Sequence, residues 1–509
     1  MAEHPFNPHR ELRRWLEEIE SNLDYFRTSY NQAIWQRIAG GRESDAQPWR
    51  EKQHSLLLSE GLWESIEFYL AQQLPPALAR RLVLLQRLVR RTRMAADARL
   101  VSLRSEINHH ISQYPLVVKN RCVSNTELFD IFTQEPDCEL REAAWRSKTG
   151  LGETIEPLVN ELMQRRNCLA QENGYRNYAD SFLSQSELDA GWVAELLTEL
   201  ERASEQPYLD FLARSADRAG LKEIAPWDVL YLVEREIALP PSLFPPERIL
   251  PLFRRLTSEL GFDRWAQELD MHIQDIPYNA LTFIVSVPDV IHVVSNPSPG
   301  YRYYRILFHE FGHALAAHYN KQSDYLYKWE EVPCFNEGLA QIMTHFTIYP
   351  RWLREHVGVN ESLLRGFAER EAAVNVYRYR DWLALASFEN AAYRDSDQDL
   401  RVLWRENYQR FYKTSHPDMI SWATVPYYTN YPFHFLNSIV ADVASYQIHA
   451  FLQADLSASF PFHTEVAAFL IKNFYAPGCS VGWKERVECA TGKPPSWEDM
   501  IASFRHLLS

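Results

Sequence analysis

The sequence predicts a mainly α-helical protein with one small β-sheet. Aromatic residues far outnumber glycine, the residue that most favours turns: the 509 residues include 15 Trp, 26 Tyr and 26 Phe but only 17 Gly. Apolar residues recur three and four positions apart in long stretches, as they do on one face of a helix. Only residues 281–295 carry β-branched runs, LTFIVSV and VIHVVS, which are separated by Pro288 and Asp289. We therefore expect long helices packed around one short sheet.

Charge and composition argue against a nucleic-acid-binding protein, a secreted protein and a membrane protein. A formal net charge of −14 argues against nucleic acid as the main partner. The N-terminal segment has no apolar signal core, and no run of about 18 uncharged apolar residues indicates a membrane span. The six cysteines have no C-x-x-C spacing, which is typical of reduced thiols. We expect a cytoplasmic protein that binds neither nucleic acid nor a membrane.

The N-terminal residues, 1–120, are expected to form a separate group of helices that serves as part of a wall or lid. Residues 121–509 would form the main body of a single domain. Apolar spacing predicts N-terminal helices over three stretches, 8–38, 50–73 and 77–112. The third carries a row of arginines, most of which we expect to be solvated, with attraction of an acidic partner as the alternative: Arg80, Arg81, Arg87, Arg90, Arg91, Arg93, Arg99 and Arg104.

The segment from Arg305 to Gln341 carries the strongest chemical signal. His309, Glu310 and His313 have the spacing H-E-x-x-H. Residues four apart share a helix face, so both imidazoles can reach one ion, and imidazole with carboxylate suits zinc. A glutamate directly after the first histidine is placed to act as general base on a water molecule. The apolar surroundings make these ionisable groups costly to bury unless they are paired or bound to metal.

Gly312 lies inside this motif and indicates close packing. Glycine costs about 1 kcal/mol relative to alanine in a helix interior. We therefore expect another segment to approach the helix closely at this position.

Three glutamates compete to be the third ligand: Glu330, Glu331 and Glu337. Glu337 lies in NEGLAQIMTHF, whose apolar spacing predicts a buried helix that would hold a carboxylate rigidly. Glu330 and Glu331 precede Pro333, where a solvated loop is expected. We favour Glu337, with Glu331 as the alternative.

These motifs resemble the helical gluzincin zinc peptidases. HEFGHALAAH followed by FNEGLAQ, with Glu337 28 residues after His309, is similar to the thimet oligopeptidase and oligoendopeptidase F family. The spacing of the third ligand also suits the angiotensin-converting enzymes. EVPC, which begins at Glu331, resembles the family's E-A-P-S form and keeps that glutamate as a candidate. Within residues 139–180, RRNCLAQENGYRNY resembles another family segment, which we interpret as structural.

The resemblance implies a fold and a cofactor. The fold would be a two-lobed helical ellipsoid with a deep central channel and a small sheet beside the zinc helix. One Zn²⁺ per chain would be held by His309, His313 and Glu337. An edge strand of the sheet would bind an extended peptide through its main chain. His292 stands where the family often has arginine. We interpret it as a core histidine, with a position facing the cleft as the alternative.

Aromatic residues cluster within residues 421–440 between predicted helices, at the position of the family's tyrosine-bearing loop. Tyr428 and Tyr431 match a Y-x-x-Y spacing used in angiotensin-converting enzymes, whereas another register would select Tyr427 and His434. A phenol can donate a hydrogen bond to the oxyanion of a tetrahedral intermediate. The helices expected in the C-terminal half span about 364–394, 397–412, 433–454 and 459–474.

Together these features predict a zinc metallopeptidase that hydrolyses bonds in short or unstructured peptides. Glu310 would act as the base, and Tyr431 or Tyr428 would support the oxyanion. A carboxypeptidase or dipeptidyl carboxypeptidase remains open, since Lys413, Tyr427 or Tyr428 offers groups for a free carboxylate. A maturation peptidase for one biosynthetic peptide is also open. A non-catalytic helical peptide-binding protein would have no reason to keep all four motif residues.

Overall fold

The computed structural model describes residues 8–41, 44–236, 239–276, 279–395, 397–415, 418, 420–456 and 460–504. The predicted fold class is confirmed, because the described residues are mainly helical with one small three-stranded sheet and a two-stranded hairpin. The chain divides into two compact units, each of which is built from separate stretches of sequence.

The first unit comprises Met1–Ala96, Pro241–Thr347 and Ala444–Ser496. Its described helices are α1 (Pro8–Gly40), α2 (Gln47–Leu57), α3 (Leu62–Leu70), α4 (Pro76–Ala95), α11 (Ile249–Glu259), α12 (Arg264–Glu268), α13 (Tyr301–His318), α14 (Tyr325–Trp329), α15 (Pro333–Phe346), α21 (Glu465–Leu470) and α22 (Trp483–Thr491).

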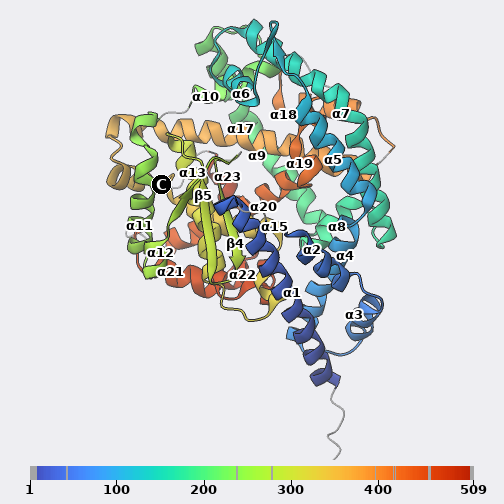
Figure 1. The fold of residues 1–509 in the computed structure, drawn as a ribbon. Helices are drawn as coiled ribbons and strands as arrows, with labels where there is room; N and C mark the ends of the chain where they lie inside the picture. The colour runs from blue at the N-terminus through green and yellow to red at the C-terminus, as the bar shows by residue number, and fades with distance from the viewer. Residues whose placement is uncertain are drawn as a thin grey trace, which may run out of the picture. The chain divides into compact units, whose positions relative to one another are not determined.

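The sheet of this unit has the strand order β3–β5–β4, with β3 (Met271–Ile273), β4 (Ala280–Ser286) and β5 (Val290–Ser295). β4 and β5 pair antiparallel, with Thr282 opposite Val293, and β3 pairs parallel to β5. This confirms the predicted β region. α13 packs against β4 and β5, and α1 lies along β4 (Figure 1).

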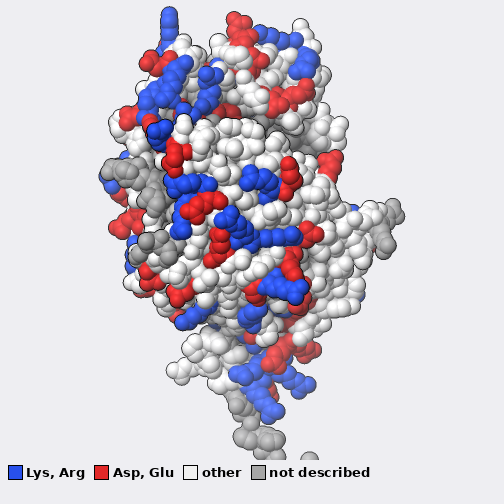
Figure 2. Space-filling model, turned by 90° about the vertical axis from the view of Figure 1, so that its left-hand side faces the viewer, with Lys and Arg blue, Asp and Glu red and all other residues white. Residues whose placement is uncertain are grey.

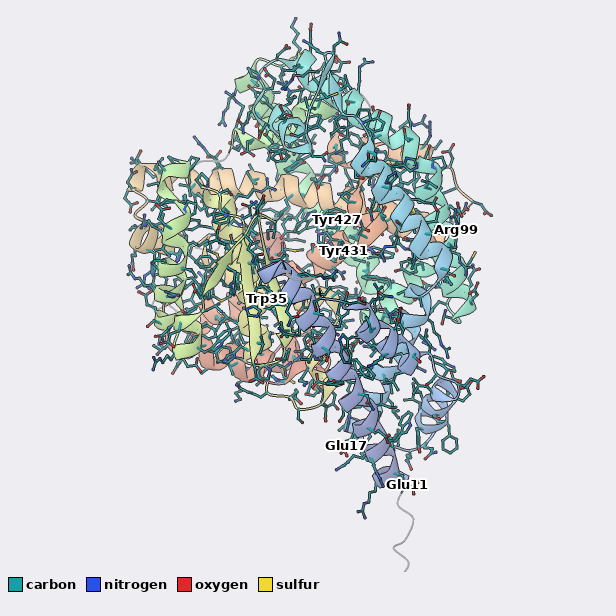
Figure 3. All side chains as sticks on the ribbon, in the orientation of Figure 1. Glu11, Glu17, Trp35, Arg99, Tyr427 and Tyr431 are labelled. Atoms are coloured by element: carbon teal, nitrogen blue, oxygen red, sulfur yellow. The ribbon has the colours of Figure 1, made fainter. Side chains whose placement is uncertain are left out.

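The end of α1 covers one face of the sheet with Trp35. Its indole packs on Val285 and Val294 in a small apolar core. The same ring stacks on His292, with 3.7 Å between the ring centroids, and Figure 3 places Trp35 over the strands. His292 therefore packs between the helix and the sheet, where burial, with the neighbouring His272, lowers its pKa to about 4.

Two of the predicted N-terminal helices are each divided in the structure. The stretch 50–73 breaks at Gly61, whose φ of 78° gives a left-handed start to α3. The stretch 77–112 breaks at Asp97, whose side chain accepts a hydrogen bond from the Leu100 amide and caps a new helix. Arg81 of the row is buried and pairs with Glu20 at 2.7 Å, whereas Arg91 is half-exposed and pairs with the buried Glu330. The row is therefore solvated apart from the buried Arg81 and the partly covered arginines beside it.

The second unit comprises Asp97–Pro240, Ile348–Val443 and Trp497–Ser509. Its described helices are α5 (Ala98–Gln113), α6 (Asn125–Gln134), α7 (Cys138–Glu172), α8 (Tyr178–Gln185), α9 (Ala190–Ala219), α10 (Val229–Glu234), α16 (Pro350–Trp352), α17 (Glu361–Arg394), α18 (Leu400–Tyr412), α19 (Pro426–Asn430) and α23 (Glu498–Ala502). The hairpin is β1 (Val117–Val118) and β2 (Arg121–Cys122), and α20 (His434–Leu456) begins in this unit and ends in the first.

The C-terminal helices follow the prediction except at one place. α17, α18 and α20 match three of the predicted stretches. The stretch 459–474 contains only α21 and a following π-helical turn, and residue 459 lies outside the described residues.

The surface carries charges of both signs. On the face drawn in Figure 2, basic and acidic side chains are intermixed over most of the area. Among the described helices, none combines the length and apolar character that a membrane crossing requires. All six cysteines are free thiols, and Cys334 and Cys479 are buried.

Candidate metal centre

The H-E-x-x-H segment lies in the middle of α13. Phe308, Phe311 and Ala314 are fully buried on one side of this helix. His309 and His313 lie on another face, with 4.8 Å between their ring centroids. The alternation of apolar and ionisable residues in the sequence therefore separates the two faces as predicted, and it leaves both imidazoles directed at one place.

Close packing of α15 on α13 positions the third candidate ligand. A Cβ added at Gly312 would lie 2.5 Å from the carbonyl oxygen of Ala340 and 2.7 Å from its Cα. Only glycine permits this approach, as the sequence predicts. Glu337 lies one helical turn before Ala340 on α15, and the close contact places it opposite the two histidines.

His309, His313 and Glu337 form a compact group. Glu337 Oε2 lies 3.2 Å from His309 Nε2, and Glu337 Oε1 lies 3.9 Å from His313 Nε2. One ligand atom from each residue lies within 4.8 Å of the others, and this is the only such group of three metal-binding side chains in the described chain.

The donor set and spacing fit zinc. Two ligand atoms at about 2.1 Å from a tetrahedral zinc lie about 3.4 Å apart, close to the separations in this group. Two imidazoles and one carboxylate are a common set in catalytic zinc sites, where a fourth position stays open. The three side chains are between 15% and 34% exposed, so an ion and a substrate can reach them.

Gln341 orients one imidazole, a role that the metal-binding motif alone does not predict. Its Oε1 lies 3.2 Å from His309 Nδ1. An amide oxygen can only accept, so the contact places the proton on Nδ1 and leaves Nε2 free to bind metal. Gln341 stands four residues after Glu337, on the same face of α15. The four-residue spacing from Glu337 is the sequence feature that indicates a contact of Gln341 with the histidines.

The surroundings of the two histidines shift their pKa values in opposite directions. For His309, burial opposes the charged form, but the hydrogen bond and charge of Glu337, with Glu310 and Gln341, outweigh it and raise the pKa. For His313, burial dominates over the attraction of Glu337 and lowers the pKa.

Glu330 and Glu331 lie in ion pairs away from this group. Glu330 is buried and pairs with Arg91 of α4 at 2.6 Å. Glu331 pairs with Arg486, a buried residue of α22. Both carboxylates therefore anchor the start of α15, and the structure brings Glu337 rather than either of them to the histidines.

The strand β4 is tied to the same helix. Thr282 Oγ1 donates a hydrogen bond of 2.6 Å to the carbonyl oxygen of Glu310. β4 is an edge strand of the sheet, so the small sheet does lie beside the helix that carries the H-E-x-x-H motif.

The four aromatic-loop candidates belong to the second unit. Tyr427 stacks on His434 with 3.9 Å between the ring centroids, and it is 37% exposed. Tyr431 is 66% exposed and lies beside Tyr427 (Figure 3). Tyr428 is fully buried, and its hydroxyl donates to the carbonyl oxygen of Leu385 at 2.8 Å. Lys413 pairs with Glu205 at 2.6 Å.

Comparison with known proteins adds one finding from another part of the chain. A profile of the angiotensin-converting enzyme peptidase family, M2, matches residues 7–208. The match covers less than half of the chain and does not include the metal group. No curated protein matches the sequence. The N-terminal match and the separate His-His-Glu group together support a zinc peptidase.

Proposed function

We propose that this protein is a zinc-dependent oligopeptidase, which hydrolyses peptide bonds in short or unstructured peptides. The observation that carries the proposal is the group of His309, His313 and Glu337, with Glu310 beside it on the same helix. The thimet oligopeptidase and oligoendopeptidase F family is the placement we favour for its chemistry. The N-terminal match to the angiotensin-converting enzyme family agrees with the same class of peptidase.

Three residues would hold the ion, through His309 Nε2, His313 Nε2 and a carboxylate oxygen of Glu337. Zinc bound there supplies Lewis acidity, which polarises a peptide carbonyl and acidifies a water molecule. Gln341 keeps the His309 ring in the tautomer and orientation that binding requires.

Glu310 would carry the proton. Its position directly after His309 places its carboxylate on the same stretch of α13 as the ligands. We infer that it takes a proton from the attacking water and delivers it to the leaving amine. Thr282 holds the Glu310 main chain at the sheet, which helps to fix the base relative to β4.

β4 is the proposed docking edge for the substrate main chain. An extended peptide that adds to an edge strand is held by main-chain hydrogen bonds, so many side chains are tolerated. The polypeptide must be extended to bind in this way, which explains a preference for unstructured substrates.

Of the tyrosines, Tyr431 is the proposed oxyanion donor, because its hydroxyl belongs to an exposed side chain. Tyr428 suits this role less well, since its hydroxyl is buried and already donates to Leu385. Tyr427 and His434 remain the alternative pair. A carboxypeptidase would use Lys413 to bind a terminal carboxylate. Lys413 already forms an ion pair with Glu205, and this favours an oligopeptidase.

The test is cleavage of a mixed peptide library by the zinc-loaded protein, with products identified by mass spectrometry. Wild type should cut internal bonds, and Glu310→Gln should lose about 10²- to 10⁴-fold in kcat while it keeps its zinc. Glu268→Gln, on the exposed surface of α12, is the matched control and should behave as wild type. Near-normal turnover by Glu310→Gln would remove that residue from the mechanism, and an absence of cleavage by wild type would refute the peptidase.

A further inference from the structure

The segment Tyr427–Phe433 of the second unit has two kinds of side chain. Tyr427 and Tyr431 are 37% and 66% exposed, whereas Tyr428, Thr429 and Phe433 are at most 1% exposed. Two phenol rings therefore face outward from a segment whose remaining large side chains are anchored inside the unit. Figure 3 shows the two exposed rings next to each other.

Arg166 of α7 binds the main chain of this segment from the interior of the unit. It is only 4% exposed. Its guanidinium donates to the carbonyl oxygens of Tyr428 and Thr429 at 2.5 and 2.7 Å, and to the Tyr393 hydroxyl at 2.9 Å. A buried charge is costly unless it is fully hydrogen-bonded, and here the hydrogen bonds go to two consecutive carbonyls of one short segment.

Glu389 of α17 fixes the other end of the segment. Its carboxyl group is fully buried and accepts a hydrogen bond of 2.9 Å from the Phe433 amide. Phe433 has a φ of 61°, a conformation that costs a bulky residue energy and that persists only when its surroundings enforce it. Strain of this kind is concentrated at sites where a side chain has to be presented in one geometry.

We propose that Arg166 and Glu389 are positioning residues, which hold the Tyr427–Phe433 segment so that the Tyr431 hydroxyl is presented in a fixed place. The inference rests on the proposed role of Tyr431. A hydrogen-bond donor stabilises a developing oxyanion best when it needs no reorganisation at the moment of reaction. Neither positioning residue touches the substrate, and each acts through the main chain that carries Tyr431.

The central experiment is a double-mutant cycle with Arg166→Gln and Tyr431→Phe. Tyr431→Phe should lower kcat by about 10²- to 10³-fold, as the loss of an oxyanion donor does. Arg166→Gln should lower kcat with little change in KM, and the double variant should be no slower than Tyr431→Phe alone. Arg165→Gln is the matched control, because Arg165 is the neighbouring arginine of α7 and pairs with Asp97 near the surface. It should keep wild-type kinetics.

Hydrogen exchange supplies a readout that does not depend on chemistry. Peptides that cover residues 426–434 should exchange faster in Arg166→Gln, while peptides from α13 should not change. Arg166→Lys keeps the buried charge but cannot fork across two carbonyls, so it should lie between wild type and the glutamine variant. If Arg166→Gln does not fold, Arg166→Lys takes its place in the same measurements.

Several outcomes would overturn the inference. Losses of kcat that simply multiply in the double variant would mean that Arg166 acts elsewhere. Unchanged exchange of residues 426–434 in Arg166→Gln would mean that it does not hold the segment. A Tyr431→Phe variant with normal kcat would refute the positioning role. It would leave the proposed peptidase function intact, because Glu310→Gln tests that function separately.

Discussion

Gly312 and Ala340 are in backbone contact across α13 and α15, at the point where the candidate ligands converge. The three nearest atoms that an added Cβ would meet, the carbonyl oxygen, the Cα and the carbonyl carbon of Ala340, all belong to the main chain. No change of rotamer can relieve such a clash. The separation of the two helices is therefore set by the absence of a side chain at one residue next to His313.

Gly312→Ala should consequently weaken zinc binding and lower stability. Helix propensity alone favours alanine by about 1 kcal/mol, while overpacking typically costs about 1–3 kcal/mol, so we expect a net loss. Zinc titration of the metal-free protein and thermal unfolding measure the two effects. Gly366→Ala in α17 is the control, because its nearest neighbour would be Arg370 Nε at 3.8 Å, and it should be neutral or stabilising. Equal behaviour of the two variants would show that the helices have room to adjust.

The second prediction concerns Gln341. Gln341→Leu removes the acceptor for His309 Nδ1–H, so the ring is free to turn and to change tautomer. Loss of such a partner typically costs 10- to 100-fold in metal affinity. Gln341→Glu keeps an acceptor at this position and should bind zinc at least as well as Gln341→Leu. Competition with a chromophoric chelator measures the affinities, and wild-type affinity in Gln341→Leu would contradict the orienting role.

The third prediction separates the competing glutamates. Glu337→Gln should lose most of its zinc, because the carboxylate faces both imidazoles. Glu331→Gln should keep its zinc but unfold more easily, since it weakens the pairing of the buried Arg486. Metal analysis after dialysis, with unfolding measured on the same samples, distinguishes the two. Zinc loss in Glu331→Gln without zinc loss in Glu337→Gln would reverse the assignment.

Local patterns predicted the part of the site that lies on one helix. His309 and His313 share a face of α13 because of their spacing alone, and Gly312 indicated a close neighbour before that neighbour was known. The exclusion of Glu331 depends on Arg486, which is remote in sequence and joins it only in the folded unit. Likewise, the assembly of each unit from separate stretches leaves no trace in composition, because buried contacts between distant segments decide it.

The aromatic loop within residues 421–440 shows the same limit more sharply. The sequence offered four candidates that differ only in register. Burial separates them, because Tyr428 donates to Leu385 inside the unit whereas Tyr431 is exposed. The proposed roles of Arg166 and Glu389 could not be read from the sequence at all, since each forms hydrogen bonds with main-chain atoms far away along the chain.

The last prediction concerns the pH dependence of stability. Burial raises the pKa of Glu389 to about 8, and the Phe433 amide and the charge of Arg166 oppose this only in part. In an unfolded chain the same carboxyl titrates near its ordinary value of about 4.3. The folded protein therefore holds a proton that the unfolded chain releases between these two pH values. Its stabilising contribution is complete below about pH 4.3 and is lost as the pH rises through 8, by about 1.4 kcal/mol per pH unit within that window.

Glu389→Gln removes this titration and preserves the shape of the side chain. Relative to wild type, the variant should therefore become progressively more stable between pH 5 and pH 8, with no further relative gain above that range. Urea midpoints measured at several pH values and one ionic strength provide the comparison. If the two proteins keep a constant difference in midpoint across the range, Glu389 is ionised in the folded protein at all these pH values, and its carboxylate must have a stronger partner than the Phe433 amide.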